Sequence, residues 1–136
     1  MGDTRDWLEA LYGQSPGYFA LTAFSGGKPR LTKWYSTSDL DLADRGIRGT
    51  AKRADVYVSM ATYAKPPVDE RSRGRQSDVL SIPGFWADLD IGEAGHKPAA
   101  LPHPPTEVAA MSIVESLPEP SMTLMSGGGL QAFWLF

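Results

Sequence analysis

The stretch Phe85-Trp86-Ala87-Asp88-Leu89-Asp90-Ile91 carries most of the information about fold and function. Its aromatic and aliphatic residues predict a β-strand. In a strand, side chains at positions i and i+2 leave the same face of the sheet. We therefore expect the carboxylates of Asp88 and Asp90 to project together, while Leu89 and Ile91 pack behind them. Two neighbouring anions repel each other unless they are protonated, paired with cations or bridged by a metal ion.

Carboxylate oxygens are ligands that hard divalent cations prefer, so Asp88 and Asp90 are candidate ligands of Mg²⁺ or Mn²⁺. A solvated junction between strand and loop is the structural alternative, and the two acids alone leave it open. An EF-hand loop starting at Asp88 is excluded, because it would need an oxygen ligand at Gly92 and a Glu where Ala99 stands. A glycosidase pair is excluded as well, because neighbours on one strand would not flank a sugar ring from opposite sides.

A second informative segment is Ser126-Gly127-Gly128-Gly129-Leu130-Gln131-Ala132-Phe133-Trp134-Leu135-Phe136. Glycines allow positive φ and close approach of backbone N–H groups to a ligand, and such backbone nests bind phosphate oxygens. A plain hairpin turn is the alternative interpretation, although three consecutive glycines exceed what a two-residue turn needs. Ser126 does not resemble a hydrolase nucleophile, because Leu124 stands where Gly-x-Ser-x-Gly requires glycine. The chain also has no P-loop sequence.

These segments occur in a fixed order: the strand at residues 86–91, a connection with a helix between Pro102 and Pro120, and then residues 121–130 with the triple glycine. In this order and spacing the chain resembles the archaeo-eukaryotic primase superfamily, in particular the plasmid- and phage-type primase-polymerases, which include RepB-like primases. The strong part of the resemblance spans residues 84–136. It implies an α/β (α+β) fold, with a mixed sheet, flanking helices and a primase-like catalytic core in which an RRM-like half is incomplete.

The resemblance also implies roles for individual residues. Asp88 and Asp90 would be the catalytic metal ligands, for Mg²⁺ or Mn²⁺, and the nucleotide would be bound by Ser126, Gly127, Gly128, Gly129 and Gln131. Where the family usually has a histidine that contacts phosphates, this chain has Gln131, which donates hydrogen bonds but never carries charge. The family's third acidic motif does not occur before Phe136. We expect the chain to be a piece of a longer primase, with a reduced relative as the alternative.

The function that the resemblance implies is a DNA primase/polymerase-type nucleotidyltransferase. It would use two divalent metals to join nucleoside triphosphates on a single-stranded DNA template in plasmid or phage replication, with a fused or associated helicase as a further partner. The alternative is a catalytically reduced nucleotide- or DNA-binding domain of a replication protein. A structural α/β domain whose two acids end a strand is a third interpretation. Whether this piece alone is active stays open.

Composition narrows these classes. With 136 residues, 42% of them hydrophobic, the chain is long enough to bury a core, and it has no long apolar run. The absence of cysteine excludes disulfides, thiolate chemistry and Cys-type zinc sites. Residues 1–6 lack the features of a secretory signal, and we expect a cytoplasmic location without membrane contact. The net charge of -3 differs from the positive net charge that is typical of nucleic-acid-binding domains.

The distribution of charged residues along the chain is more informative than the net charge. The basic residues fall into three clusters: Lys28, Arg30 and Lys33; Arg45, Arg48, Lys52 and Arg53; and Lys65, Arg71, Arg73 and Arg75. Solvated faces are the usual explanation of such clusters. The third cluster lies in a basic loop at residues 64–77, directly before the Asp88 strand. We expect this loop to fold over the carboxylates and to contact phosphates of the nucleotide or the nucleic acid.

The remaining pattern predicts a single, partial catalytic domain over residues 1–136. Helices are expected after Asp3, after Ser38 or Asp39 with interruptions at Gly46 and Gly49, and after Thr106. The third of these helices is expected to bury Val108, Met111, Val114 or Ile113, and Leu117. Strands are expected at 18–24, 31–35, 55–63, around Asp88, at 122–125 and at 130–136, with a turn of helix near 78–82. In the Pro/Gly-rich connection at 92–105, Glu93 is expected beyond the strand, and His96 and His103 are expected in an exposed loop.

Overall fold

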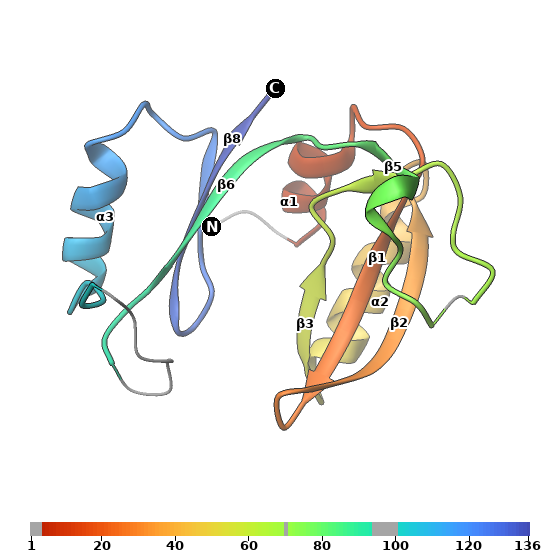
Figure 1. Cartoon of the computed structure of the whole chain (residues 1–136), viewed down its shortest axis with the longest axis horizontal. Coiled ribbons are helices and arrows are strands. Elements are labelled where there is room, and N and C mark those ends of the chain that lie inside the picture. The colour runs from red at the N-terminus through yellow and green to blue at the C-terminus, as the bar shows by residue number, and fades with distance from the viewer. Residues whose placement is uncertain (1–3, 70, 94–100) are drawn as a thin grey trace. The chain divides into compact units, whose positions relative to one another are not determined.

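The structure is a computed structural model that describes residues 4–69, 71–93 and 101–136. Within these residues it is a mixed α+β fold with three α-helices and two antiparallel sheets (Figure 1). Contacts along the chain divide it into two compact units, residues 1–83 and 84–136. None of the described helices has the length and apolar character needed to cross a membrane.

The first unit is built around the hairpin of β1 (Tyr18–Ser25) and β2 (Lys28–Ser36). Gly26 and Gly27 adopt φ of 59° and 70°, as expected for the tight turn of a two-residue hairpin. On its other edge β1 pairs with β3 (Asp55–Val58) and β4 (Thr62–Tyr63), and β4 pairs with β5 (Val79–Ser81). All these pairings are antiparallel, and they confirm the two predicted strands at 18–24 and 31–35.

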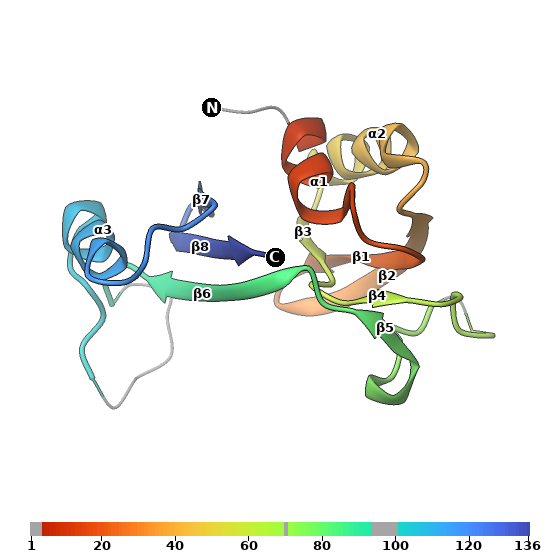
Figure 2. The same ribbon diagram turned by 90° about the horizontal axis from the view of Figure 1, so that it is seen from above.

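Two helices, α1 (Thr4–Tyr12) and α2 (Leu40–Ala51), cover one face of this sheet (Figure 2). The core between them includes Leu8, Leu11 and Tyr12 of α1 and Phe19 and Leu21 of β1. The ring of Tyr12 stacks on Phe19 with the ring centroids 4.1 Å apart, and its hydroxyl donates to the carbonyl of Ser59. Burial raises the pKa of Tyr12, so this hydroxyl stays protonated and continues to donate.

Helix α2 begins after Asp39, whose Oδ1 accepts a hydrogen bond from the N–H of Leu42 at 3.1 Å. The predicted interruption at Gly46 and Gly49 is wrong, because the helix runs through both glycines. Gly46 serves packing instead. A Cβ added at Gly46 would lie 2.1 Å from Oη of Tyr35, whereas a Cβ at Gly49 would meet nothing within 4 Å.

These two glycines offer a matched test of helix packing. Gly49→Ala should stabilise the chain by about 1 kcal/mol, because alanine is the better helix former and the site has room. Gly46→Ala should destabilise it by about 1–3 kcal/mol, because the buried ring of Tyr35 must move. Urea unfolding midpoints measure both effects. Shifts of the same sign in the two variants would contradict this account of α2.

The second unit consists of β6 (Gly84–Asp90), α3 (Glu107–Glu115), β7 (Met122–Met125) and β8 (Gly129–Leu135). The strand order is β6-β8-β7, and β8 is antiparallel to both of its neighbours. The predicted strands around Asp88, at 122–125 and at 130–136 are thereby confirmed. Strands β6 and β7 run parallel without touching, because β8 turns back at the glycines and inserts between them. The predicted mixed sheet is therefore wrong in its pairing, since both sheets are purely antiparallel.

Helix α3 packs on one face of this second sheet. It begins after Thr106, whose Oγ1 accepts from the N–H of Ala109 at 3.2 Å, as predicted from the sequence. Ala110 and Val114, four residues apart, pack against Leu130 and Ala132 of β8. Val108 and Leu117 were also expected on this face, but Val108 is 77% exposed and Leu117, which follows the helix, is exposed as well. Ala110 and Val114 make the contact instead.

Two further predictions need correction. The strand expected at 55–63 is divided into β3 and β4 at Ser59. The N–H of Ser59 donates to the carbonyl of Ala20, but the N–H of Ala20 donates to the side-chain Oγ of Ser59, which itself donates to the carbonyl of Ala61. The helical turn expected near 78–82 is a short 3-10 helix, η1 (Gln76–Asp78), followed by β5. Asp3 and His96, for which a cap and a loop position were predicted, lie outside the described residues.

Candidate functional site

Asp88 and Asp90 lie on one face of β6. The alternate residue Leu89 packs with α3 against Leu130 and Ala132, so the period of two directs both aspartates to the face opposite α3. This confirms the expected common face, with Leu89 and Ile91 packed behind it. The carboxylates therefore lie on the sheet face opposite the apolar core that Leu89 forms with α3.

Strand β8 brings the glycine turn beside these carboxylates. In the ladder, Asp90 is paired with Gly129 and Asp88 with Gln131. The N–H of Ile91 donates to the carbonyl of Gly128 at 3.0 Å, which marks a hydrogen-bonded pair. Because bonded and non-bonded pairs alternate, the two aspartate pairs are of the non-bonded kind, in which Cα atoms are about 4.5 Å apart and side chains are closest. The side chain of Gln131 is thus the immediate neighbour of Asp88 in the ladder, whereas the residue paired with Asp90 is Gly129, which has no side chain.

The glycine turn uses most of its polar groups internally. Both the N–H and the hydroxyl of Ser126 donate to the carbonyl of Gly129, at 2.9 and 3.2 Å. Gly127 adopts φ of 85°, and its N–H has no hydrogen-bond partner among the described residues. A Cβ at Gly129 would lie 2.4 Å from the carbonyl oxygen of Leu89. Ser126 therefore closes the turn, Gly129 allows β8 to approach β6, and Gly127 keeps a donor for a ligand.

The side-chain oxygens of Asp88, Asp90 and Gln131 are of the kind that binds a hard cation which also contacts phosphate. Two carboxylates and an amide oxygen match the way Mg²⁺ is bound, with one or two carboxylates, several waters and substrate phosphates. Residues 4–69, 71–93 and 101–136 contain no cluster of three or more His, Cys, Asp or Glu side chains placed to hold a metal. Glu93 lies beyond β6, as predicted, and its carboxylate accepts from the backbone N–H of His103 at 3.2 Å.

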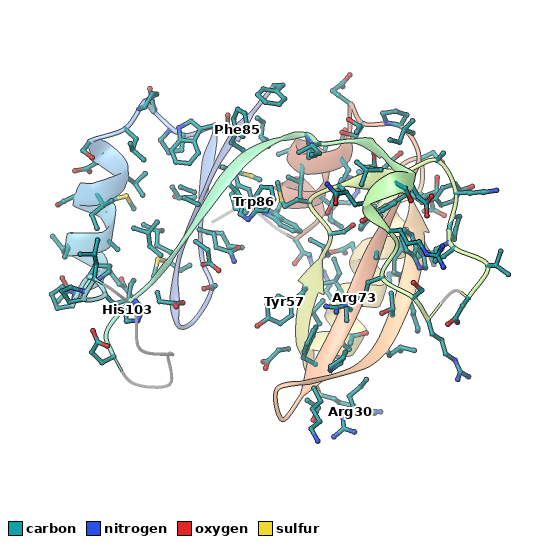
Figure 3. All side chains as sticks on the ribbon, viewed as in Figure 1. Arg30, Tyr57, Arg73, Phe85, Trp86 and His103 are labelled. Carbon is teal, nitrogen blue, oxygen red and sulfur yellow. The ribbon has the colours of Figure 1, made fainter. Side chains whose placement is uncertain are left out.

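The basic loop is anchored on the sheet of the first unit. The indole N–H of Trp34 donates to the carbonyl of Ser72 at 3.0 Å, and Gly74, at φ of 83°, lies against the rings of Trp34 and Tyr63. Arg73 lines a cavity of about 210 Å³ together with Tyr57 on this sheet (Figure 3). The side chains of Lys65, Arg71, Arg73 and Arg75 are all exposed. The position of the loop over the Asp88 strand stays a prediction.

The second unit therefore brings together four of the predicted features on one edge: Asp88, Asp90, the glycine turn and Gln131. Carboxylates, an amide and a backbone N–H at such an edge have the chemistry to hold a metal ion and a phosphate side by side. A comparison of the chain with protein-family models, curated proteins and solved structures found no match. The functional argument therefore depends on the residues and their geometry.

Proposed function

We propose that this chain is a catalytic module of a nucleotidyltransferase of the archaeo-eukaryotic primase type, in the branch of plasmid and phage primase-polymerases. The observation that carries the proposal is the register of β6 and β8, which sets Gly129 opposite Asp90 and Gln131 opposite Asp88. The module would join nucleoside triphosphates on a single-stranded DNA template during plasmid or phage replication in the cytoplasm. A helicase, fused or associated, would be its partner.

The topology of the second unit supports this proposal. Its chain order β6-α3-β7-β8 and its sheet order β6-β8-β7, with the helix on one face, match the first four elements of a ferredoxin-like β-α-β-β-α-β arrangement. This arrangement supports the proposal because the resemblance implies an incomplete RRM-like half. The carboxylates lie on the face that α3 leaves uncovered. A substrate could therefore approach them without displacing the helix.

Each of these residues has a proposed role that follows from its chemistry. Asp88 and Asp90 would hold Mg²⁺ or Mn²⁺, which in such sites activates the attacking 3′-hydroxyl and stabilises the departing pyrophosphate. The side-chain NH₂ of Gln131 would donate a hydrogen bond to a phosphate oxygen, and the backbone N–H of Gly127 would donate a second one. Lys65, Arg71, Arg73 and Arg75 would neutralise the phosphate charge that remains.

Incorporation of nucleoside triphosphates opposite a single-stranded DNA template, with Mn²⁺ or Mg²⁺ present, tests the proposal directly. EDTA should abolish the incorporation. A protein that contains this chain and still extends a primer in EDTA would not be using these carboxylates as metal ligands.

A second candidate function is a nucleotide- or DNA-binding domain without catalysis. Gln131 favours it, because a glutamine cannot supply the charge that the family histidine offers to phosphates. The lack of a third acidic side chain beside Asp88 and Asp90, within the part of the chain that the structure describes, points the same way. This candidate predicts nucleotide binding without incorporation.

Gln131→His is expected to raise the affinity for a nucleoside triphosphate about three- to tenfold at pH 6, with little gain at pH 8. The gain requires the protonated imidazole, since charge-assisted hydrogen bonds to phosphate are roughly twice as strong as neutral ones. Calorimetric titration at both pH values measures it, with the exposed Gln14→His as the matched control. Equal affinities for Gln131→His and the parent at pH 6 would show that position 131 does not contact phosphate.

A further inference from the structure

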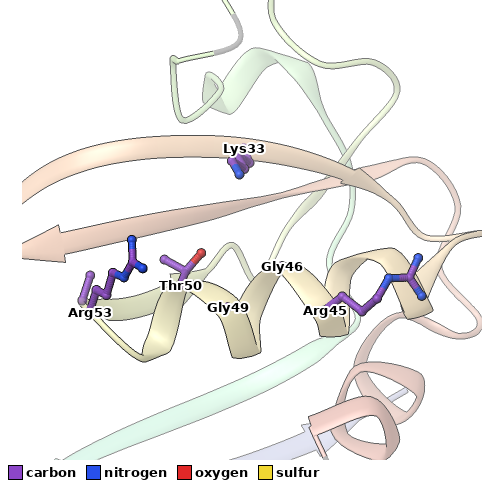
Figure 4. Close-up of a pocket in the computed structure, with 7 residues that line it drawn as sticks. Lys33, Arg45, Gly46, Gly49, Thr50 and Arg53 are labelled. Carbon is purple, nitrogen blue, oxygen red and sulfur yellow. The ribbon is translucent and has the colours of Figure 1, made fainter.

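A second concave surface lies in the first unit, between α2 and β2. It is a cavity of about 430 Å³ lined by Lys33, Arg45, Gly46, Gly49, Thr50, Arg53 and Ala54. Figure 4 shows Lys33 on its strand facing the helix, with Arg45 and Arg53 on either side of the two glycines. The cations come from two clusters that are separate in the sequence, so only the fold brings them together.

The cations at this cavity differ from other arginines of the same unit. Arg5 contacts the carboxylates of Glu9 and Asp41, and Arg48 contacts Asp44 at 2.9 Å. Among the described residues, no carboxylate lies within 4.0 Å of the side-chain nitrogens of Lys33, Arg45 or Arg53. In a chain of net charge -3, these three exposed positive groups lie around one cavity, where a bound anion would interact favourably with all of them.

The spacing along the helix indicates an extended anion. Arg45 and Gly49 are four residues apart and so share one face of α2, whereas Arg53 follows the C-cap residue Lys52, and the helix rises about 9 Å between Arg45 and Ala51. The two arginines therefore lie at opposite ends of the cavity, with both glycines between them, so that each can contact a different phosphate of an extended anion. Arg53 also follows the C-terminus of α2, where the helix dipole disfavours anions, so the side-chain cations must supply the binding energy.

We propose that this cavity binds successive phosphates of a single-stranded nucleic acid. Arg45 and Arg53 contact phosphates at its two ends, Lys33 contacts the strand from the β2 side, and Thr50 offers a hydroxyl donor. Gly49 has no side chain and nothing within 4 Å of its Cβ position, so the backbone of the strand can approach the helix closely there. The choice of nucleic acid rests on the proposed function, whereas the phosphate chemistry rests on the cavity alone.

The test measures binding of a fluorescent oligothymidylate to the 136-residue chain by anisotropy, in EDTA, so that metal chemistry at Asp88 and Asp90 plays no part. Arg45→Gln/Arg53→Gln should weaken binding on the order of tenfold at about 50 mM salt and lower the salt slope by about 1.4, since each phosphate contact contributes about 0.7. Arg48→Gln removes the same charge per residue outside the cavity and should change binding by less than about twofold.

Gly49→Leu tests whether binding depends on the cavity itself or only on the electrostatic field of the whole protein. It keeps the charge, favours the helix and fills the space over α2, so it should weaken oligonucleotide binding without lowering the unfolding midpoint. Losses in Arg45→Gln/Arg53→Gln no larger than in Arg48→Gln, or full binding by Gly49→Leu, would overturn the proposal. So would binding of a nucleoside triphosphate with no binding of the oligonucleotide, because the cavity would then serve free polyphosphates. If the chain binds the oligonucleotide in EDTA, but a protein that contains the chain incorporates no nucleotide with metal present, this site would stand and the proposed function would fail.

Discussion

Asp88→Asn and Asp90→Asn should each reduce metal-dependent nucleotide incorporation on the order of a thousandfold or more. Asparagine has nearly the same shape as aspartate but lacks the negative charge, so it is a poor ligand for Mg²⁺ or Mn²⁺. The two side chains share one face beside Gly129 and Gln131, so we expect the loss to appear in both variants. Primer extension with each metal measures the loss, and Mn²⁺ titration of the isolated chain measures the accompanying loss of metal binding.

The stability of the same variants distinguishes a metal site from a strand that merely ends in two acids. Without metal, Asp88→Asn removes one of two like charges and should leave the free energy of unfolding unchanged or slightly raised. Asp55→Asn, at the start of β3 in the first unit, is the matched control, because it changes a strand aspartate away from the site. Full activity in both Asp88→Asn and Asp90→Asn would end the assignment to a metal-dependent nucleotidyltransferase.

Gly129→Ala should destabilise the chain by about 3 kcal/mol and should also reduce activity. Its Cβ would lie 2.4 Å from the carbonyl oxygen of Leu89, and a backbone atom in a paired strand cannot move aside without disturbing the ladder. The disturbed segment carries Asp90, so the geometry of the metal site changes with it. Urea unfolding, together with Mn²⁺ affinity, measures the two effects.

Gly127→Ala is the control for the glycine turn. A Cβ there would meet nothing within 4 Å, so the cost is limited to the left-handed backbone at φ of 85°, about 1–2 kcal/mol. We therefore expect Gly129→Ala to be clearly the more damaging of the two. The reverse order would show that the turn conformation, and not the approach of β8 to β6, is what these glycines provide.

Local sequence signals predicted the elements that depend on local chemistry. Thr106 marked the start of α3, the glycines between residues 25 and 29 marked the first hairpin, and the alternation around Asp88 placed both carboxylates on one face. Each of these depends on residues a few positions apart. The order β6-β8-β7 could not be derived in that way, because it depends on β8 pairing with β6, from which residues 91–128 separate it.

Other features were hidden because a residue's partner is distant in the sequence. The composition of α2 suggested that Gly46 interrupts a helix, whereas Gly46 makes room for Tyr35 of β2. The contact of the basic loop with Trp34 joins residues 38 positions apart, and its expected place over the carboxylates stays a prediction. Likewise, Lys33 and Arg53 belong to separate basic clusters and meet only once α2 has docked on β2.

The position of β6 in its sheet has a consequence for how the aspartates can be reached. Among the described residues β6 pairs only with β8, so its outer backbone groups form an open border of the sheet. Such a border accepts a further strand through main-chain hydrogen bonds. A strand added there would lay every second side chain directly alongside Asp88 and Asp90, and an acid among them would supply a further oxygen ligand from the outer side.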